Sequence, residues 1–229
     1  MKKIAVLQSN YIPWKGYFDL INMVDEFILY DSVQYTKNDW RNRNKIQTNQ
    51  GLKWLTIPIR QNSLKQKISE TQISDNRWSV KHWKTICQNY SNAKYFHIYK
   101  EQFEKIYLNN SEEYLSQINY KFIVEICKIL NIETLIRWDS EFNLIDGRTE
   151  KLISICKQCD ASIYLSGPSA KNYFNEEKAK KSNIEVEWMD YNNYKEYNQL
   201  NSPFAHDVTI LDLIFNNGPN SKNFMKSFK

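Results

Sequence analysis

The amino-terminal segment places one helix between two short apolar strands, and this order limits the folds that are open to the chain. Residues 3–8 form an apolar run, residues 17–24 carry apolar side chains at helical spacing, and residues 26–31 form a second apolar run. A strand, a helix and a strand in this order build a parallel pair joined by a right-handed crossover. We therefore predict an α/β fold class with a parallel sheet.

The same alternation returns in the second half of the chain. The pattern predicts helices at residues 149–159 and 208–216 and strands at residues 134–138, 161–166 and 184–189. The last helix is expected to end at Asn217-Gly218-Pro219, because glycine and proline stop helices there. These elements extend the predicted parallel sheet.

The middle of the chain interrupts the alternation with a hairpin and several helices. Trp40–Gln47 and Lys53–Ile59 have the pattern of strands, with the turn signal Asn49-Gln50-Gly51 between them. Residues 60–76 are polar and have no helical period, so we expect a loop with a short extended piece.

Helical spacing follows this loop, at residues 79–90, 101–108 and 112–130. We therefore predict that residues 1–229 form a single α/β domain. Within it we expect a hairpin insertion at residues 36–60 and a helical subdomain at residues 77–131.

Composition points to an intracellular protein that handles small ligands. No stretch approaches the roughly 18 uncharged apolar residues that span a bilayer, so we expect a cytoplasmic chain with no membrane partner. The four cysteines lie in helical patterns, and Cys156 and Cys159 are spaced to share one buried helix face. A net charge of +5 permits phosphate-bearing partners without requiring a nucleic acid.

Aromatic residues make up 14% of the chain, and many lie among Asn, Gln and Lys. That mixture suits a groove that stacks rings or sugars. In an open α/β sheet, such a groove lies beyond the carboxyl ends of the strands. Two segments have this position, Gln8–Tyr17 and Ser166–Tyr173.

A basic segment follows the second strand. If Trp40–Ile46 is a strand, alternation places Arg41, Arg43 and Lys45 on one face, with Trp40 on the other. Three cations on one face can bind a diphosphate. The alternative is a solvated edge strand whose charges discourage aggregation.

His82 and Asp31 are the candidate acid–base groups. Asp31 ends the second predicted strand and is placed to act as a general base, although it can also cap a turn. His82 lies on a helix between a lysine and a tryptophan, which also suits surface packing. His206 precedes the last helix, where Asp207 can cap the amino terminus. The spacing of these residues predicts no metal site.

Trp14-Lys15-Gly16-Tyr17 resembles, by spacing, the HxGH signature loop of nucleotidylyltransferases, with Trp14 and Tyr17 in place of the two histidines. The loop at Ser166–Ser169 is similar to their serine-rich phosphate loop. The resemblance implies a nucleotide-binding, Rossmann-like or nucleotidylyltransferase-like core. It does not imply nucleotidyl transfer, because Trp and Tyr cannot supply an imidazolium charge to the phosphorus.

Several segments together resemble the WbqC-like family. They are the loop at residues 8–18, Asp31-Ser32-Val33-Gln34-Tyr35, Trp40–Ile46, Trp54–Pro58, Ser166–Ser169 and Ile210–Gly218. Members of this family usually have proline where this chain has Ser9. The family occurs in gene clusters for O-antigen and other surface polysaccharides, including lipopolysaccharide. The resemblance therefore implies work on a nucleotide-linked sugar, and we expect transfer of an acyl or aminoacyl group to the amine of a dideoxyamino sugar.

This expectation assigns roles to particular side chains. The base would be His82 or Asp31. The substrate-binding residues would be Gln8, Asn10, Tyr11, Trp14, Lys15, Tyr17, Gln34, Tyr35, Trp40, Arg41, Asn42, Arg43, Ser166, Gly167 and Ser169. The sequence identifies no bound cofactor, and ATP, an acyl carrier or an aminoacyl-tRNA remain open as sources of the acyl group. The aromatic-rich surface is compatible with a homodimer.

Two other functions remain open. Aromatic side chains among Lys and Arg are also typical of proteins that bind single-stranded nucleic acid or tRNA. Because the basic residues are dispersed along the chain, nucleic-acid binding ranks second among the predicted functions. A catalytically silent nucleotide-binding scaffold is the third, because both signature histidines are replaced.

Overall fold

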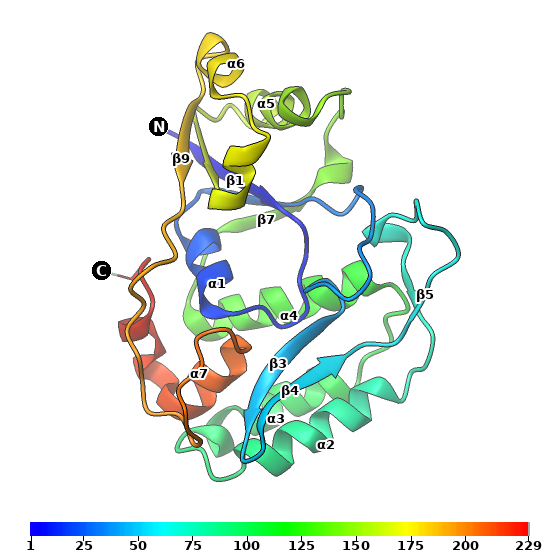
Figure 1. Cartoon of the computed structure of the whole chain (residues 1–229), viewed down its shortest axis with the longest axis vertical. Helices are drawn as coiled ribbons and strands as arrows, with labels where there is room; N and C mark the ends of the chain where they lie inside the picture. The colour runs from blue at the N-terminus through cyan, green and yellow to red at the C-terminus, as the bar shows by residue number, and fades with distance from the viewer. Residues whose placement is uncertain (229) are drawn as a thin grey trace.

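The structure is a computed structural model that describes residues 1–228, and a five-stranded parallel sheet lies at its centre (Figure 1). All of its neighbouring strands run parallel. In spatial order the strands are β7 (Leu135–Trp138), β2 (Glu26–Leu29), β1 (Lys3–Leu7), β8 (Ile163–Ser166) and β9 (Glu185–Trp188). The predicted α/β class with a Rossmann-like core is confirmed.

The predicted strand–helix–strand unit begins the fold. α1 (Lys15–Asn22) connects β1 to β2, and the register of the two strands pairs Ile4 with Glu26. Side chains alternate between the two faces of β1, so Ile4 joins one apolar cluster and Ala5 the other. Both residues are fully buried, as expected for a parallel sheet covered on both faces.

Helices cover the two faces of the sheet unequally (Figure 1). α5 (Arg148–Gln158) and α6 (Glu176–Lys181) contribute to the smaller apolar cluster, above the sheet in the view of Figure 1. α1, α4 (Leu115–Leu130) and α7 (Ile210–Asn217) belong to the larger cluster below it. Within residues 1–228, no helix is both long enough and apolar enough to cross a membrane.

A hairpin and two further helices extend the larger cluster. β3 (Arg43–Thr48) and β4 (Gly51–Thr56) form the predicted antiparallel hairpin. Gly51 has a φ of 97°, which favours glycine at the predicted turn. α2 (Trp78–Tyr90) and α3 (Phe96–Leu108) pack against each other beneath the hairpin.

Residues 60–76 contain more regular structure than predicted. β5 (Ile59–Arg60) pairs with β6 (Gln72–Ile73), and η1 (Ile68–Glu70) is a 3₁₀ turn between them. Helix α6 was also missed, because it buries only Ala179 and so has no apolar stripe. Further 3₁₀ segments are η2 (Asp139–Glu141), η3 (Pro168–Asn172) and η4 (Gly218–Phe224).

The cysteines are free thiols that pack as small apolar groups. Cys127, Cys156 and Cys159 are buried, and Cys87 is partly buried. Burial raises the pKa of the Cys156 and Cys159 thiols to about 12, so both are protonated at neutral pH. The spacing of this pair therefore reflects a shared buried face next to the sheet.

A buried carboxylate fixes the irregular segment that precedes α7. Residues 189–209 contain neither helix nor strand. Backbone hydrogen bonds join their ends, Met189 and Thr209, to Ser166 and Lys45, and side-chain contacts hold the part between. Asp212 is fully buried and accepts hydrogen bonds from the hydroxyls of Tyr90 and Tyr197, both at 2.8 Å, and from the amide of Gln199 at 2.9 Å. Burial raises the pKa of Asp212, and these donors oppose that shift.

We expect Asp212→Ala to lower the free energy of unfolding by about 3 kcal/mol, because it leaves several buried donors without an acceptor. Urea denaturation followed by tryptophan fluorescence measures the loss. Asp146 is exposed, and Asp146→Ala should change stability by no more than about 0.5 kcal/mol. A loss below about 1 kcal/mol for Asp212→Ala would contradict the role given to this carboxylate.

Candidate functional site

The carboxyl ends of β1 and β8 meet where the strand order reverses. From β1 the chain proceeds outward to β2 and β7, then returns to the other side of β1 with β8 and β9. Ligands of open parallel sheets bind beyond the carboxyl ends of the strands at such a switch point. The two predicted ligand loops follow β1 and β8, so both lie at this edge.

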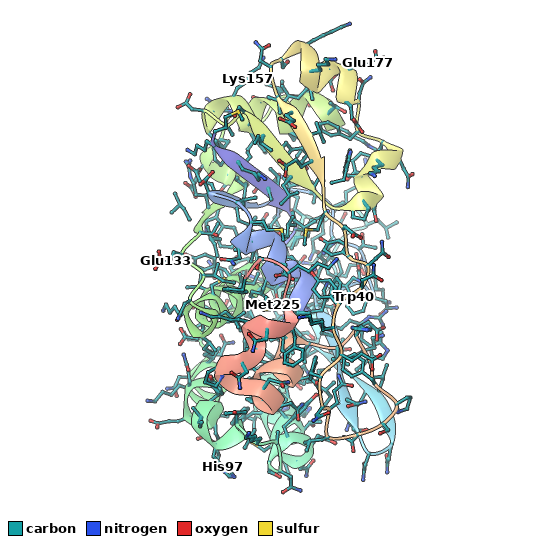
Figure 2. All side chains as sticks on the ribbon, turned by 90° about the vertical axis from the view of Figure 1, so that its left-hand side faces the viewer. Trp40, His97, Glu133, Lys157, Glu177 and Met225 are labelled. Carbon is teal, nitrogen blue, oxygen red and sulfur yellow. The ribbon has the colours of Figure 1, made fainter. Side chains whose placement is uncertain are left out.

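A cavity of about 220 Å³ opens beside the loop after β1. Its wall combines two indole rings, two amides and an imidazole. The lining residues are Asn10, Pro13, Trp14, Trp40, Asn44, His206 and Asp207. Figure 2 shows Trp40 on the right-hand flank, about halfway along the molecule. The cavity thus joins the loop after β1, the start of the hairpin and the irregular segment before α7.

The loop after β1 has a strained turn at the cavity. Ile12 has a φ of 35°, which β-branched residues rarely adopt. The amide of Asn44 donates to the carbonyls of Tyr11 at 3.2 Å and Ile12 at 2.8 Å, and the Tyr11 N–H donates to the Trp40 carbonyl at 3.0 Å. Such strain costs roughly 1–3 kcal/mol and persists only where its surroundings fix it. The hairpin therefore holds the turn from which Trp14 leaves the loop.

Trp14 forms one wall of the cavity, and Gly16 makes room for it. A Cβ atom on residue 16 would lie 2.4 Å from the Trp14 ring. The other side of the indole contacts Tyr191 and Tyr194, with ring centres 5.3 and 5.4 Å away. Glycine at this point of the Trp14-Lys15-Gly16-Tyr17 motif therefore permits the packing of the indole.

Arg41 bonds to the loop after β1 and does not lie on the face of the hairpin strand. β3 begins at Arg43, so Arg41 precedes the strand. Its guanidinium donates to the side-chain oxygens of Asn10 and Gln8. The prediction that three cations share one strand face is therefore wrong for Arg41, but the residue still places a positive charge next to the cavity wall.

Trp40 also lies differently from the predicted alternation. Its ring centre is 5.6 Å from Lys45 Nζ and 5.4 Å from the ring centre of Trp54 on β4. Trp40 and Lys45 therefore lie on the same side, whereas the sequence pattern placed them on opposite faces. The alternation of a strand does not apply to residues 40–42, because the strand starts only at Arg43.

His206 and Asp207 complete the cavity. Asp207 pairs with Lys45, and Thr209 caps α7 by accepting a hydrogen bond from Leu211 N–H at 3.3 Å. The prediction of Asp207 as the helix cap is therefore wrong. Partial desolvation and the nearby charge of Lys15 lower the pKa of His206, so its imidazole is neutral at pH 7. A neutral imidazole in a cavity wall can accept a proton.

Lys15 lies behind this wall and is buried. Its ammonium donates to the Lys195 carbonyl at 3.0 Å and lies 4.9 and 5.2 Å from the ring centres of Tyr194 and Tyr197. Burial lowers the pKa of Lys15 to about 8, and the nearby carboxylate of Asp19 opposes the shift. Lys15 therefore contacts the irregular segment that carries His206.

Asp31 lies at the base of the loop, below the cavity. It is fully buried and accepts hydrogen bonds from Ser9 N–H at 2.8 Å and from the hydroxyl of Ser116. Asn119 donates to the Ser9 hydroxyl at 3.0 Å. Burial raises the pKa of Asp31. In this structure Asp31 ties β2 and α4 to the loop, and its assignment as a base remains a prediction.

His82 is buried on the far side of the loop. Its Nδ1 shares a hydrogen bond with the hydroxyl of Tyr11 at 2.9 Å, and that hydroxyl also bonds to the hydroxyl of Tyr107 at 2.9 Å. Burial lowers the pKa of His82 to about 4. The surface position considered for His82 is wrong, and its catalytic role stays a prediction. Neither His82 nor Tyr11 is part of the cavity wall.

The other predicted binding residues do not line the cavity. Tyr17 donates to the Gln8 carbonyl at 3.0 Å, and Asn42 to the Ile57 carbonyl at 2.9 Å. Gln34 donates to the Leu64 carbonyl at 2.6 Å, and Tyr35 is buried. Ser166 is the last residue of β8, Gly167 follows it, and Ser169 lies in η3.

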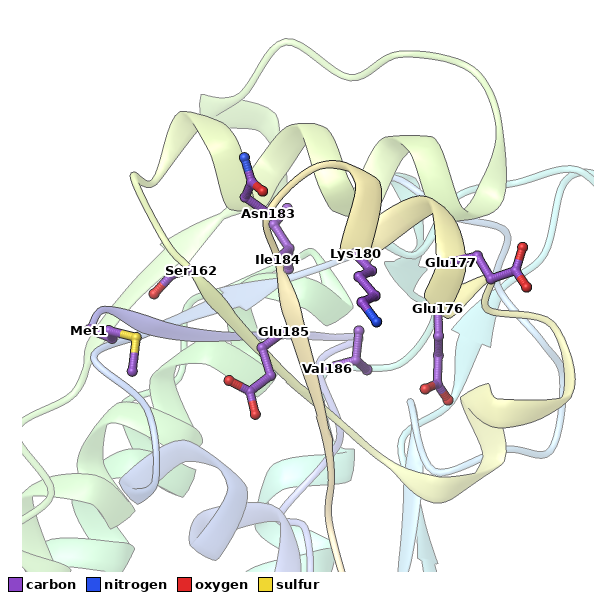
Figure 3. A pocket seen from close by; sticks show the side chains of 9 residues that line it. All are labelled: Met1, Ser162, Glu176, Glu177, Lys180, Asn183, Ile184, Glu185 and Val186. Carbon is purple, nitrogen blue, oxygen red and sulfur yellow. The ribbon is translucent and has the colours of Figure 1, made fainter.

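A second hollow lies at the opposite edge of the sheet. It measures about 620 Å³ and is lined by residues from the amino ends of the strands and from α6, including Ser162, Glu176, Lys180 and Glu185 (Figure 3). The amino ends of parallel strands are not where ligands of this fold class bind. Within residues 1–228, no group of three or more His, Cys, Asp or Glu side chains is arranged to hold a metal ion.

Comparison with known proteins gives three results. A family model described as the WbqC-like protein family matches residues 8–224. A protein of Mycobacterium tuberculosis (strain ATCC 25618 / H37Rv), named "Uncharacterized protein Rv1507c", is 45% identical over 227 residues, which cover 99% of this chain and 98% of that protein. No solved structure matches the chain significantly. The family match includes all three segments that form the cavity.

The buried position of His82 predicts a specific pH dependence of stability. The unfolded state, with a histidine pKa near 6.5, binds more protons between pH 6.5 and 4 than the folded state does, so stability falls as the pH decreases through this window. His82 alone accounts for a loss of about 3 kcal/mol. Glutamine does not titrate, so the His82→Gln variant lacks this loss. The difference in free energy of unfolding between the wild type and the variant should therefore become smaller from pH 6.5 to pH 4.

Urea denaturation at several pH values measures this difference. His97→Gln provides the matched control, because it makes the same chemical change at an exposed position. Parallel profiles for the wild type and His82→Gln would contradict the buried, neutral state of this imidazole.

Proposed function

The chain belongs to the WbqC-like protein family, and we propose that it is a transferase of surface polysaccharide biosynthesis that acts on a nucleotide-linked sugar. The transferred group is an acyl or aminoacyl group, and the acceptor is the amine of a dideoxyamino sugar. The observation that carries this proposal is the cavity at the carboxyl end of β1. Its wall combines two indole rings with a neutral imidazole, and the cations Lys45 and Arg41 bond to its lining residues Asp207 and Asn10.

The size and lining of the cavity support binding of a single sugar ring. Sites that enclose a whole drug-sized ligand measure roughly 300–1,000 Å³, and this cavity has about 220 Å³. The indoles of Trp14 and Trp40 offer apolar faces to the C–H surface of a pyranose, and the amide of Asn10 can bond its hydroxyls. The nucleotide then extends from the opening.

The cations beside the cavity suit the diphosphate of such a substrate. In the structure Lys45 pairs with Asp207. Arg41 is held by the side chains of Asn10 and Gln8 and lies 3.6 Å from the carboxylate of Asp39. A diphosphate carries more negative charge than these partners and accepts bidentate bonds from Arg. Substrate binding would therefore exchange internal partners for phosphate oxygens.

His206 is placed to take the proton in the transfer step. The neutral sugar amine attacks the acyl carbonyl carbon and forms the C–N bond. The bond from that carbon to the leaving oxygen or sulfur of the donor breaks, and the leaving group departs with the electron pair. The amine proton passes to His206, whose lowered pKa keeps it neutral at pH 7 and able to accept.

The acyl donor is an activated ester or thioester, a class that includes acyl carriers and aminoacyl-tRNA. The loop at Ser166–Ser169 lies at the same edge of the sheet and is the natural place for its approach. We place the reaction in the cytoplasm, where nucleotide-linked sugars are made.

Turnover tests this proposal directly. The purified protein is incubated with UDP- and dTDP-linked 4-amino-4,6-dideoxyhexoses and a panel of acyl thioesters and aminoacyl-tRNAs, and mass spectrometry detects the N-acylated sugar nucleotide. We expect one combination to react, and His206→Gln to lower kcat about 100-fold or more, because removal of a general base costs roughly 10²–10⁴.

Two matched variants complete the experiment. His97→Gln makes the same chemical change on the exposed surface of α3 and should retain full activity. Arg41→Ala should raise KM for the sugar nucleotide by about tenfold, as expected for loss of a charged hydrogen bond. Unchanged turnover in His206→Gln would remove His206 as the base, and binding without product from any donor would favour a silent scaffold.

A further inference from the structure

The outer face of the hairpin carries an exposed pair of tryptophans. Trp40 is 38% and Trp54 42% exposed, and among residues 1–228 no other tryptophan is exposed. Their ring centres lie 5.4 Å apart at an interplanar angle of 42°. Large exposed apolar groups that lie together on a surface commonly mark a binding site.

Two cations lie on the same face as these rings. The guanidinium carbon of Arg43 is 4.2 Å from the ring centre of Trp54, and Lys45 Nζ is 5.4 Å from it. The hairpin register places Lys45 directly opposite Trp54. The Nε atom of Arg43 is buried and has no hydrogen-bond partner among the described residues. Indoles flanked by cations can stack a planar base and bind the phosphates attached to it.

This face, defined by Trp40, Arg43, Lys45 and Trp54, is continuous with the cavity. Trp40 belongs to both, and the partner of Lys45, Asp207, lines the cavity. A ligand with its sugar in the cavity would therefore have its phosphates near Lys45 and its base on Trp54. This order matches the order of groups in a nucleotide-linked sugar.

We propose that the outer face of the hairpin is the nucleoside subsite and that it stacks the base of a nucleoside diphosphate on Trp54. The inference rests on the proposed function, because it assumes that the cavity holds the sugar of the same molecule. It places the base on the hairpin and not on the Gly-containing loop after β8. A single pair of indoles with two cations suits one nucleotide, whereas a nucleic-acid strand requires a series of stacking positions.

Isothermal titration calorimetry with UDP, dTDP, GDP and ADP tests the subsite without knowledge of the acyl donor. We expect at least one of them to bind the wild type and Trp54→Ala to weaken that binding about tenfold, which is within the range for loss of one stacked base. Trp54→Phe, which keeps an aromatic ring, should bind within about threefold of the wild type. Inorganic pyrophosphate should bind the wild type and Trp54→Ala equally, since it has no base.

Lys53 provides a matched control for the charge on the hairpin. It is exposed on β4, and strand alternation places it on the face opposite Trp54. Arg43→Ala should weaken nucleoside diphosphate binding by about fivefold to tenfold, whereas Lys53→Ala, with the same loss of charge, should leave it unchanged. Circular dichroism spectra and melting temperatures show whether each variant is folded.

The possible outcomes separate the subsite from the proposed function. Equal binding of nucleoside diphosphates to the wild type and Trp54→Ala overturns the subsite and leaves the transferase proposal intact. Absence of binding by all four nucleotides and by the sugar nucleotides overturns the proposed function itself. Binding of a ten-nucleotide thymidine oligonucleotide far more tightly than dTDP, with a steep salt dependence, overturns the subsite in favour of a strand-binding surface.

Discussion

The buried carboxylate of Asp31 is the contact on which the position of the loop after β1 depends. Asp31 accepts hydrogen bonds from the backbone N–H of Ser9 and from the hydroxyl of Ser116. The end of β2, the loop after β1 and the start of α4 therefore meet at this carboxylate. Burial raises its pKa, and hydrogen bonds from its partners oppose that shift. The loop held in this way contains the strained turn at Ile12 and leads to Trp14, the first wall of the cavity.

The opposite wall is fixed by other means. Residues 189–209 have no helix or strand, and their position comes from side chains of α1 and α7. The carboxylate of Asp19 accepts a hydrogen bond from the Tyr194 hydroxyl at 2.6 Å, and the ammonium of Lys15 donates one to the Lys195 carbonyl. Asp212 accepts a hydrogen bond from the Tyr197 hydroxyl. The edge of the sheet and a segment tied by buried polar groups thus bring the walls of the cavity together.

Local patterns predicted most of the fold. The structure agrees with the apolar runs of β1 and β2, with the apolar stripe of α4 and with the turn at Gly51. Burial on both faces of a strand leaves a continuous apolar run in the sequence, and burial of one helix face leaves a helical period. The site was predicted less completely. Asn10, Trp14 and Trp40 do line the cavity, but Asn44 and His206 were not connected with it. Trp40 was assigned to the wrong side because the strand starts three residues later than its charge pattern suggested.

The sequence alone determined the parallel α/β sheet and placed the loop after β1 at the carboxyl end of its strands, because strand order and apolar period are local properties. Only the tertiary structure decided which side chains share the cavity. His206 follows Trp40 by more than half the chain. The segment that carries it is held by hydrogen bonds from Tyr197 and Gln199 to Asp212, and its ring packs against Phe204. Such contacts leave no period in the sequence, since each depends on one pair of residues and not on a repeated environment.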